Sequence, residues 1–104
     1  MKIVGVKACT VGVAHTYIAK DRLVEAAKKK GHSIYIETQG TIGCEDELTP
    51  EQIREADVVI LAADVSVANQ ERFKGKPIVR VKSEIAIKQP EKLLEKIEQK
   101  LKER

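Results

Sequence analysis

Aromatic residues are scarce in this chain, which has two tyrosines, one phenylalanine and no tryptophan among 104 residues. A surface that stacks nucleic-acid bases on aromatic rings is therefore not expected. The formal net charge is only +3, and the lysines are spread along predicted helices and the C-terminal tail. We interpret them as solvated helix faces and do not predict nucleic acid as a partner.

Long apolar runs are also absent from the sequence, since none approaches the roughly 18–20 residues that a membrane-spanning helix needs. The N-terminal apolar run resembles a strand and not a signal peptide. The chain has two cysteines, at positions 9 and 44, and a pair so far apart does not indicate a disulfide framework. We expect one domain over residues 1–104, located in the reducing cytoplasm and not inserted directly into a membrane.

Strand-like and helix-like segments alternate along the chain. Strands are predicted at residues 2–8, 33–38, 57–63 and 76–81. Helices are predicted at 16–30, 49–56, 83–88 and from 90 onward, with one or two irregular helical turns in 66–74. This alternation predicts a Rossmann-like α/β fold, in which a four-stranded parallel sheet is the middle layer of a three-layer α-β-α sandwich.

The composition of the strands indicates their order. Residues 57–63 are apolar on both faces and residues 2–8 nearly so, which is typical of central strands. Residues 33–38 and 76–81 alternate, so we expect them at the edges. With right-handed crossovers, the predicted order is 2-1-3-4. In this order the sheet grows to one side from the first to the second strand and to the other side from the third strand on, so its topological switch point lies between the first and third strands. Cys9, Gln39 and Asp64 should lie there, at the carboxyl ends of the strands.

The segment from Ala8 to Tyr17, with sequence ACTVGVAHTY, carries the most chemistry. Cys9 ends the first strand, a loop containing Gly12 follows, and a helix begins. Backbone N–H groups at a helix N-terminus favour an anion and lower the pKa of a nearby thiol. From these residues alone, a cysteine that carries a phosphoryl group and a plain strand-to-helix connection with a buried cysteine both remain open.

Three other kinds of cysteine site fit less well. A cysteine phosphatase needs Cys-x5-Arg, because the arginine clamps phosphate, but His15 stands at that position. A thioredoxin-like site needs a second cysteine where the chain has Gly12. A zinc site built from Cys9, His15, His32 and Cys44 lacks the usual closely spaced ligand pairs, so no metal is predicted.

Four motifs, which occur in order and span nearly the whole chain, resemble one family. They are CTVGVAHTY at 9–17, ETQGTIG at 37–43, ELTPEQIREADVVILAADV at 47–65 and RFKGKPI at 72–78. The first resembles the phosphorylation loop of the fructose-family enzyme IIB domain of the bacterial phosphoenolpyruvate-dependent sugar phosphotransferase system.

This resemblance implies that Cys9 accepts a phosphoryl group from a phosphohistidine of enzyme IIA. Cys9 would pass it to a sugar, fructose or one like it, held by the membrane enzyme IIC, without any cofactor. The predicted phosphate-binding residues, which use backbone N–H groups and two threonine hydroxyls, are Thr10, Val11, Gly12, Val13, Ala14, His15 and Thr16.

Two positions depart from the family's usual loop, because Thr10 replaces a proline and Val11 replaces a threonine. The alternative function is therefore a regulatory relative that binds its partner but transfers poorly. Gln39, Gly40, Thr41 and Asp64 are predicted to support the phosphate loop or to face a partner. Cys44 is expected in a loop, where a regulatory disulfide with Cys9 is conceivable, and His32 is expected to be an exposed helix-terminal residue.

Overall fold

The computed structural model describes residues 1–8, 13–40 and 43–102, and for residues 13–16 and 102 it describes the backbone alone. The predicted site residues Cys9, Thr10, Val11, Gly12 and Thr41 lie outside the described residues. Within the described part, no helix has the length and apolar character needed to cross a bilayer.

Five strands form one sheet in the order β3-β2-β1-β4-β5. Their bounds are β1 Lys2–Ala8, β2 Ser33–Gly40, β3 Gly43–Glu45, β4 Val58–Ala63 and β5 Ile78–Val81. All neighbouring pairs are parallel except β2 with β3, which is antiparallel. The predicted arrangement of the four long segments is therefore confirmed, with β1 and β4 at the centre.

The short strand β3 is the main difference from the prediction. It pairs Gly43, Cys44 and Glu45 with the last three residues of β2, within a segment that was expected to be a loop. The carboxyl end of β2 is thus an inner position and not an edge, and Cys44 lies in a strand and not in a loop. Three residues are too few to show the alternation by which strands are identified in a sequence.

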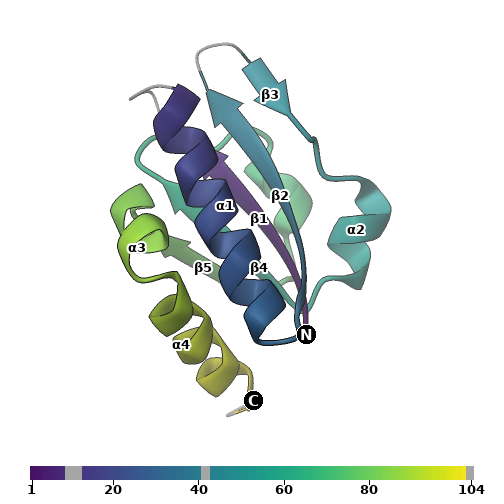
Figure 1. Ribbon diagram of the computed structural model, residues 1–104. Coiled ribbons are helices and arrows are strands. Elements are labelled where there is room, and N and C mark those ends of the chain that lie inside the picture. The colour runs from purple at the N-terminus through teal and green to yellow at the C-terminus, as the bar shows by residue number, and fades with distance from the viewer. Residues whose placement is uncertain (9–12, 41–42, 103–104) are drawn as a thin grey trace.

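Helices cover both faces of the sheet (Figure 1). One face carries α1 (Val13–Lys29), α3 (Ser83–Lys88) and α4 (Pro90–Lys102), and the other carries α2 (Pro50–Glu55) and the short 3-10 helix η1 (Gln70–Phe73). The predicted α/β class is confirmed. The first helix begins three residues earlier than predicted, at Val13 instead of residue 16.

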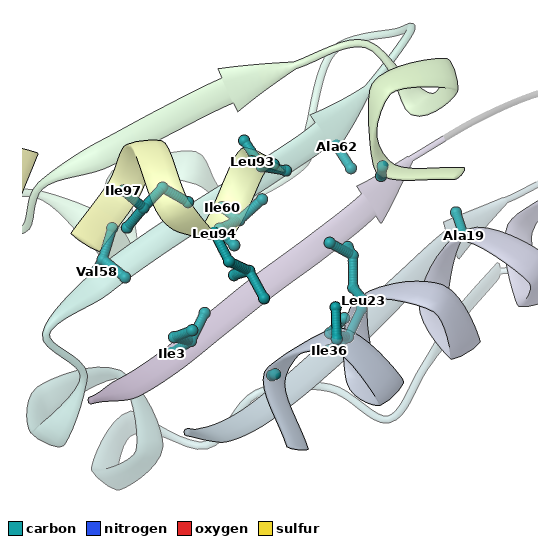
Figure 2. Packing of buried hydrophobic residues seen from close by; sticks show 13 residues of the cluster. Ile3, Ala19, Leu23, Ile36, Val58, Ile60, Ala62, Leu93, Leu94 and Ile97 are labelled. Carbon is teal, nitrogen blue, oxygen red and sulfur yellow. The ribbon is translucent and has the colours of Figure 1, made fainter. Parts of the chain in front are cut away.

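The face below α1 and α4 has an aliphatic core. Figure 2 shows side chains of β1 and β4, including Ile3 and Ile60, packed against Leu23 of α1 and Leu94 of α4. Side chains alternate between faces along each strand, so the neighbouring strand residues point to the opposite core. On that face Val4 belongs to a second hydrophobic cluster, together with Ile53 of α2 and Phe73 of η1.

Local sequence signals set the ends of the helices. A capping box opens α2, because the Gln52 N–H donates to Thr49 Oγ1 at 3.1 Å and the Thr49 N–H donates to Gln52 Oε1 at 2.9 Å. Gly31 follows α1 with a φ of +77°, a left-handed conformation that glycine adopts at little cost. Both signals were visible in the sequence.

We expect Leu94→Ala to lower the free energy of unfolding by about 2–5 kcal/mol, because it leaves a cavity in the closed core under α4. Leu94 has no exposed surface, whereas Leu101 at the end of the same helix is half-buried. Leu101→Ala is the matched control and should cost clearly less. Urea unfolding of the two variants measures the difference, and equal losses would contradict this packing of α4.

Candidate functional site

The carboxyl ends of three parallel strands meet at one edge of the sheet. Ala8, the last residue of β1, pairs with Gln39 of β2 on one side and with Ala63 of β4 on the other. Helix α1 begins nearby in the sequence at Val13, and the backbone of Val13, Ala14, His15 and Thr16 forms its first turn. The N-terminus of α1 therefore follows the end of the central strand β1 after an interval of four residues.

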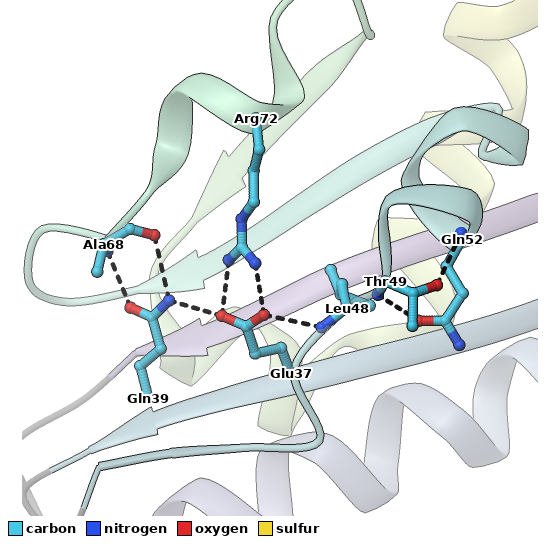
Figure 3. A network of polar contacts seen from close by, with 7 residues as sticks. All are labelled: Glu37, Gln39, Leu48, Thr49, Gln52, Ala68 and Arg72. Carbon is cyan, nitrogen blue, oxygen red and sulfur yellow. Dashed lines mark hydrogen bonds and ion pairs between the residues drawn. The ribbon is translucent and has the colours of Figure 1, made fainter.

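A buried carboxylate lies on the α2 face of this edge. Glu37 of β2 is only 1% exposed, and the guanidinium of Arg72 holds it through two hydrogen bonds of 2.7 and 2.6 Å. The Leu48 backbone N–H donates to the same carboxylate at 3.0 Å, and the Gln39 amide donates at 2.7 Å. Figure 3 shows these donors converging from η1, from the segment before α2 and from β2 itself.

The surroundings of Glu37 act on its ionisation in opposite directions. Burial by itself raises the pKa of a carboxyl group, because it disfavours the charged form. The hydrogen bonds from Arg72, Gln39 and the Leu48 N–H outweigh that effect and lower the pKa of Glu37 to about 2. Glu37 is therefore a charged structural group at neutral pH and not a proton donor or acceptor for catalysis.

Gln39 fastens the segment after β4 to the sheet. Its side-chain oxygen accepts the Ala68 N–H at 2.9 Å, and its amide donates to the Ala68 carbonyl at 3.3 Å (Figure 3). Since the same amide also donates to Glu37, both ends of the Gln39 side chain are engaged within the protein. The predicted neighbour Gly40 is exposed at the end of β2.

Asp64 directly follows β4 and contacts the start of a helix. Its Oδ1 accepts the backbone N–H of Ser83 at 3.0 Å, and Ser83 is the first residue of α3. This contact joins the end of β4 to the start of α3, on the same edge of the sheet as Ala8.

Cys44 lies in β3 opposite Gln39 and is exposed. Partial burial, followed by the nearby carboxylate of Glu37, raises the pKa of its thiol. The Cys44 thiol is therefore a poorer nucleophile than an ordinary cysteine at neutral pH. Cys44 borders a pocket of ≈ 390 Å³ at this edge, which Ala8, Gln39 and Ala68 also line.

His32 is remote from Cys44, because His32 precedes β2 whereas Cys44 pairs near the carboxyl end of that strand. His32 was predicted to be exposed, and the structure shows it largely buried. Its side chain is 13% exposed, and its Nε2 lies 2.7 Å from Glu98 Oε1 of α4. Among the described residues, no three potential metal-ligating side chains come together.

Two polar contacts hold the start of α1 against β3 and the turn that follows it. The Tyr17 hydroxyl lies 2.8 Å from both carboxylate oxygens of Glu45, and Lys20 Nζ lies 2.6 Å from Asp46 Oδ2. Both contacts are exposed, so each adds only a little stability. Their position matters more, because they fix the first turns of α1 relative to β2 and β3.

Glu37 and Arg72 were not identified from the sequence as site residues. In the strand SIYIET, alternation places Glu37 on the face opposite Ile36, where a solvent-exposed charge is the ordinary expectation. Its partner Arg72 lies 35 residues away in the sequence, beyond any local pattern. The one available signal was the presence of both residues within the motifs that resemble the family.

Comparison with known proteins identifies the family. The family model for the PTS system, Lactose/Cellobiose specific IIB subunit, matches residues 4–96. The chain belongs to this PTS IIB family. The family also accounts for the fold, since solved IIB structures have the same arrangement of strands and helices.

Relatives of known name include the PTS system fructose-like EIIB component 2 of Escherichia coli K12. It is 50% identical over 97 residues, which make up 93% of this chain and 92% of the relative. The PTS system fructose-specific EIIABC component of Bacillus subtilis is 44% identical over 91% of this chain, which corresponds to 15% of that longer protein.

Solved structures agree with these relatives. A domain of a fructose-specific IIABC component from Borrelia burgdorferi superposes with a TM-score of 0.86 and 49% identity, covering 90% of this chain and 89% of that domain. The enzyme IIB subunit of a PTS system from Escherichia coli K12 gives a TM-score of 0.92 at 33% identity, covering 98% and 94% of the two chains. A PTS sugar-phosphotransfer role follows for this chain, and its fructose-like relatives place it in that branch.

We predict that Arg72→Met lowers the free energy of unfolding by about 3–5 kcal/mol, because it leaves the Glu37 carboxylate buried without its cation. The control is Lys29→Met, which removes an exposed ion pair with Glu91 of 3.5 Å and should cost less than about 1 kcal/mol. Chemical denaturation compares the two. A loss for Arg72→Met no larger than the control would mean that the pair contributes little.

The acid stability of the protein should also depend on Glu37. Folding lowers the pKa of this group from 4.5 to about 2, so its stabilisation is fully present above pH 4.5 and is lost as the pH falls toward 2. We expect the free energy of unfolding to fall less steeply between pH 5 and pH 2 in Glu37→Gln than in the wild type. Urea unfolding at each pH measures the slope.

Glu84→Gln is the control for this pH dependence, because Glu84 is an exposed carboxylate that accepts a hydrogen bond from Lys88 on its own helix. That bond also lowers the pKa of Glu84, but solvent screens an exposed pair, so this replacement should flatten the slope less than Glu37→Gln does. If both variants have the wild-type slope, Glu37 does not carry the acid sensitivity.

Proposed function

We propose that the chain carries a phosphoryl group on Cys9, between a phosphohistidine of enzyme IIA and a sugar bound by the membrane enzyme IIC. The observation that supports this most is the position of Cys9. It directly follows the last residue of the central strand β1 and comes four residues before helix α1 begins, in a chain that belongs to the PTS IIB family.

The first transfer exchanges one bond to phosphorus for another. The Cys9 thiolate forms the S–P bond while the P–N bond of the donor phosphohistidine breaks, and the imidazole keeps the electron pair and takes up a proton. In the second transfer a sugar hydroxyl attacks phosphorus and gives up its proton, and the S–P bond breaks to return the thiolate. Neither step needs a metal or an organic cofactor.

Catalysis on this proposal comes mainly from positioning and from charge stabilisation. The phosphoryl group carries up to about two negative charges, and the unpaired N–H groups at the start of a helix favour an anion. The proposed phosphate-binding residues are Thr10, Val11, Gly12, Val13, Ala14, His15 and Thr16. Gln39, Gly40, Thr41 and Asp64 have supporting or partner-facing roles.

Apolar side chains near this edge suit contact with a protein partner. Tyr17 and Ile18 in α1 are 37% and 47% exposed, and Val65, just after β4, is 36% exposed. The names of longer relatives, such as the EIIABC component of Bacillus subtilis, support enzymes IIA and IIC as the partners. The fructose-like relatives support fructose or a similar sugar as the final acceptor.

The test uses phosphorylated enzyme IIA as donor and measures phosphate incorporation into the chain, followed by peptide mapping. We expect the wild type to be labelled on the peptide that contains Cys9, and Cys9→Ser to lose the label. Cys44→Ser is the matched control, because it removes the other cysteine, and it should be labelled like the wild type.

Two outcomes would contradict this assignment. Undiminished thiophosphate formation in Cys9→Ser would place the phosphoryl group elsewhere. Binding of enzyme IIA by the wild type without any labelling would instead support the regulatory alternative, which the unusual Thr10 and Val11 suggested.

A further inference from the structure

Lys7 is a buried lysine in the central strand β1. It is 0% exposed, and its Nζ has no hydrogen-bond partner among the described residues. An isolated ammonium group in a protein interior costs several kcal/mol unless an opposite charge or hydrogen bonds compensate. A lysine in this position therefore needs an explanation beyond packing.

The strand register places Lys7 at the edge that the proposed function uses. Lys7 is the residue before the last one of β1 and lies between Thr38 of β2 and Ala62 of β4. Because side chains alternate along a strand, Lys7 is on the same face as Ile3, which is the face below α1 and α3. Figure 2 shows Ile3 and Ala62 on that face.

A second buried polar atom lies on this face, on the other side of β4. Ser83 is 0% exposed, and its hydroxyl has no partner in the described part of the chain. Its backbone N–H is bonded to Asp64, two residues beyond the Ala62 that pairs with Lys7. The N–H of Ser83 is thus committed, whereas its hydroxyl can donate to a ligand.

We propose that Lys7 and Ser83 form a binding pair for a phosphate dianion, which is the phosphoryl group on Cys9. The inference rests on the proposed function of Cys9. Two peptide units limit the separation of the Lys7 and Cys9 Cα atoms to about 7 Å, within reach of a lysine side chain. The Lys7 ammonium balances part of the negative charge of the phosphoryl group, and the Ser83 hydroxyl donates a hydrogen bond to it.

Lys7 and Ser83 would also take the place of the phosphate-binding arginine that this sequence lacks. A cysteine phosphatase uses an arginine in its loop, whereas this chain has His15 there. A single ammonium holds charge without the bidentate geometry of a guanidinium. Such a site stabilises the bound phosphoryl group while leaving it open to an incoming acceptor.

The first experiment tests binding of inorganic phosphate. Thermal unfolding is followed in phosphate and in chloride at equal ionic strength, for the wild type, Lys7→Met and the exposed-lysine control Lys92→Met. We expect phosphate to raise the Tm of the wild type and of Lys92→Met but not that of Lys7→Met. No rise in the wild type, or an equal rise in Lys7→Met, would overturn the pair.

The stability of Lys7→Met without phosphate gives an independent readout. Methionine has a similar length and no charge, so the variant should be at least as stable as the wild type in chloride. A large loss of stability would mean that Lys7 serves the fold and would contradict the proposal. Ser83→Ala keeps the bond between the Ser83 backbone and Asp64, and should fold normally with a smaller phosphate-induced rise in Tm.

The second experiment measures the initial rate of phosphoryl uptake from phosphorylated enzyme IIA. Lys7→Met should be at least about tenfold slower than the wild type, Ser83→Ala less affected, and Lys92→Met unchanged. Equal rates in Lys7→Met and wild type would overturn the role of Lys7. If the wild type takes up no phosphoryl group, the proposed function fails, and the phosphate-dependent Tm still decides whether Lys7 and Ser83 bind the dianion as a free ion.

Discussion

The buried carboxylate of Glu37 is the contact on which the carboxyl edge of the sheet depends. It accepts hydrogen bonds from η1, from the segment before α2 and from its own strand, and so joins these three segments by polar contacts in addition to their shared apolar core. Through Gln39 the same network reaches the backbone of Ala68. Burying an ion costs energy, and the low pKa of about 2 shows that the donors more than compensate. The network thereby holds the chain after β4 beside the end of β1.

The two faces of the sheet contribute differently to this edge. On the α2 face the polar groups of Glu37, Arg72 and Gln39 satisfy one another, so they hold the structure in place. On the α1 face the Lys7 ammonium and the Ser83 hydroxyl lack hydrogen-bond partners among the described residues, which suits the binding of a transient phosphate group that we propose there. On the function that we propose, phosphoryl transfer would benefit from this division, because donors held in position beforehand need not reorganise during transfer.

The sequence predicted the main sheet because its signals are local. The unbroken apolar run 57–63 and the alternation in 76–81 placed one strand at the centre and one at the edge, and the structure has them there. β3 escaped prediction because three residues show no period. The burial of Glu37 and of Lys7 escaped for another reason, since it depends on segments distant in sequence. The sequence does contain one signal for Lys7, because a lysine is unusual inside an apolar run such as KIVGVKA.

The small strand β3 has a consequence for how the molecule behaves among its copies. A strand at the edge of a sheet offers unpaired N–H and C=O groups on which another chain can add. β3 covers β2 only at Thr38, Gln39 and Gly40, so it closes the edge at the end where Cys9 follows β1. Over the described residues, the edge of β2 nearer Ser33 has no strand beside it. Another copy of the chain could therefore add a strand only away from the end of the sheet where we propose that phosphate is carried.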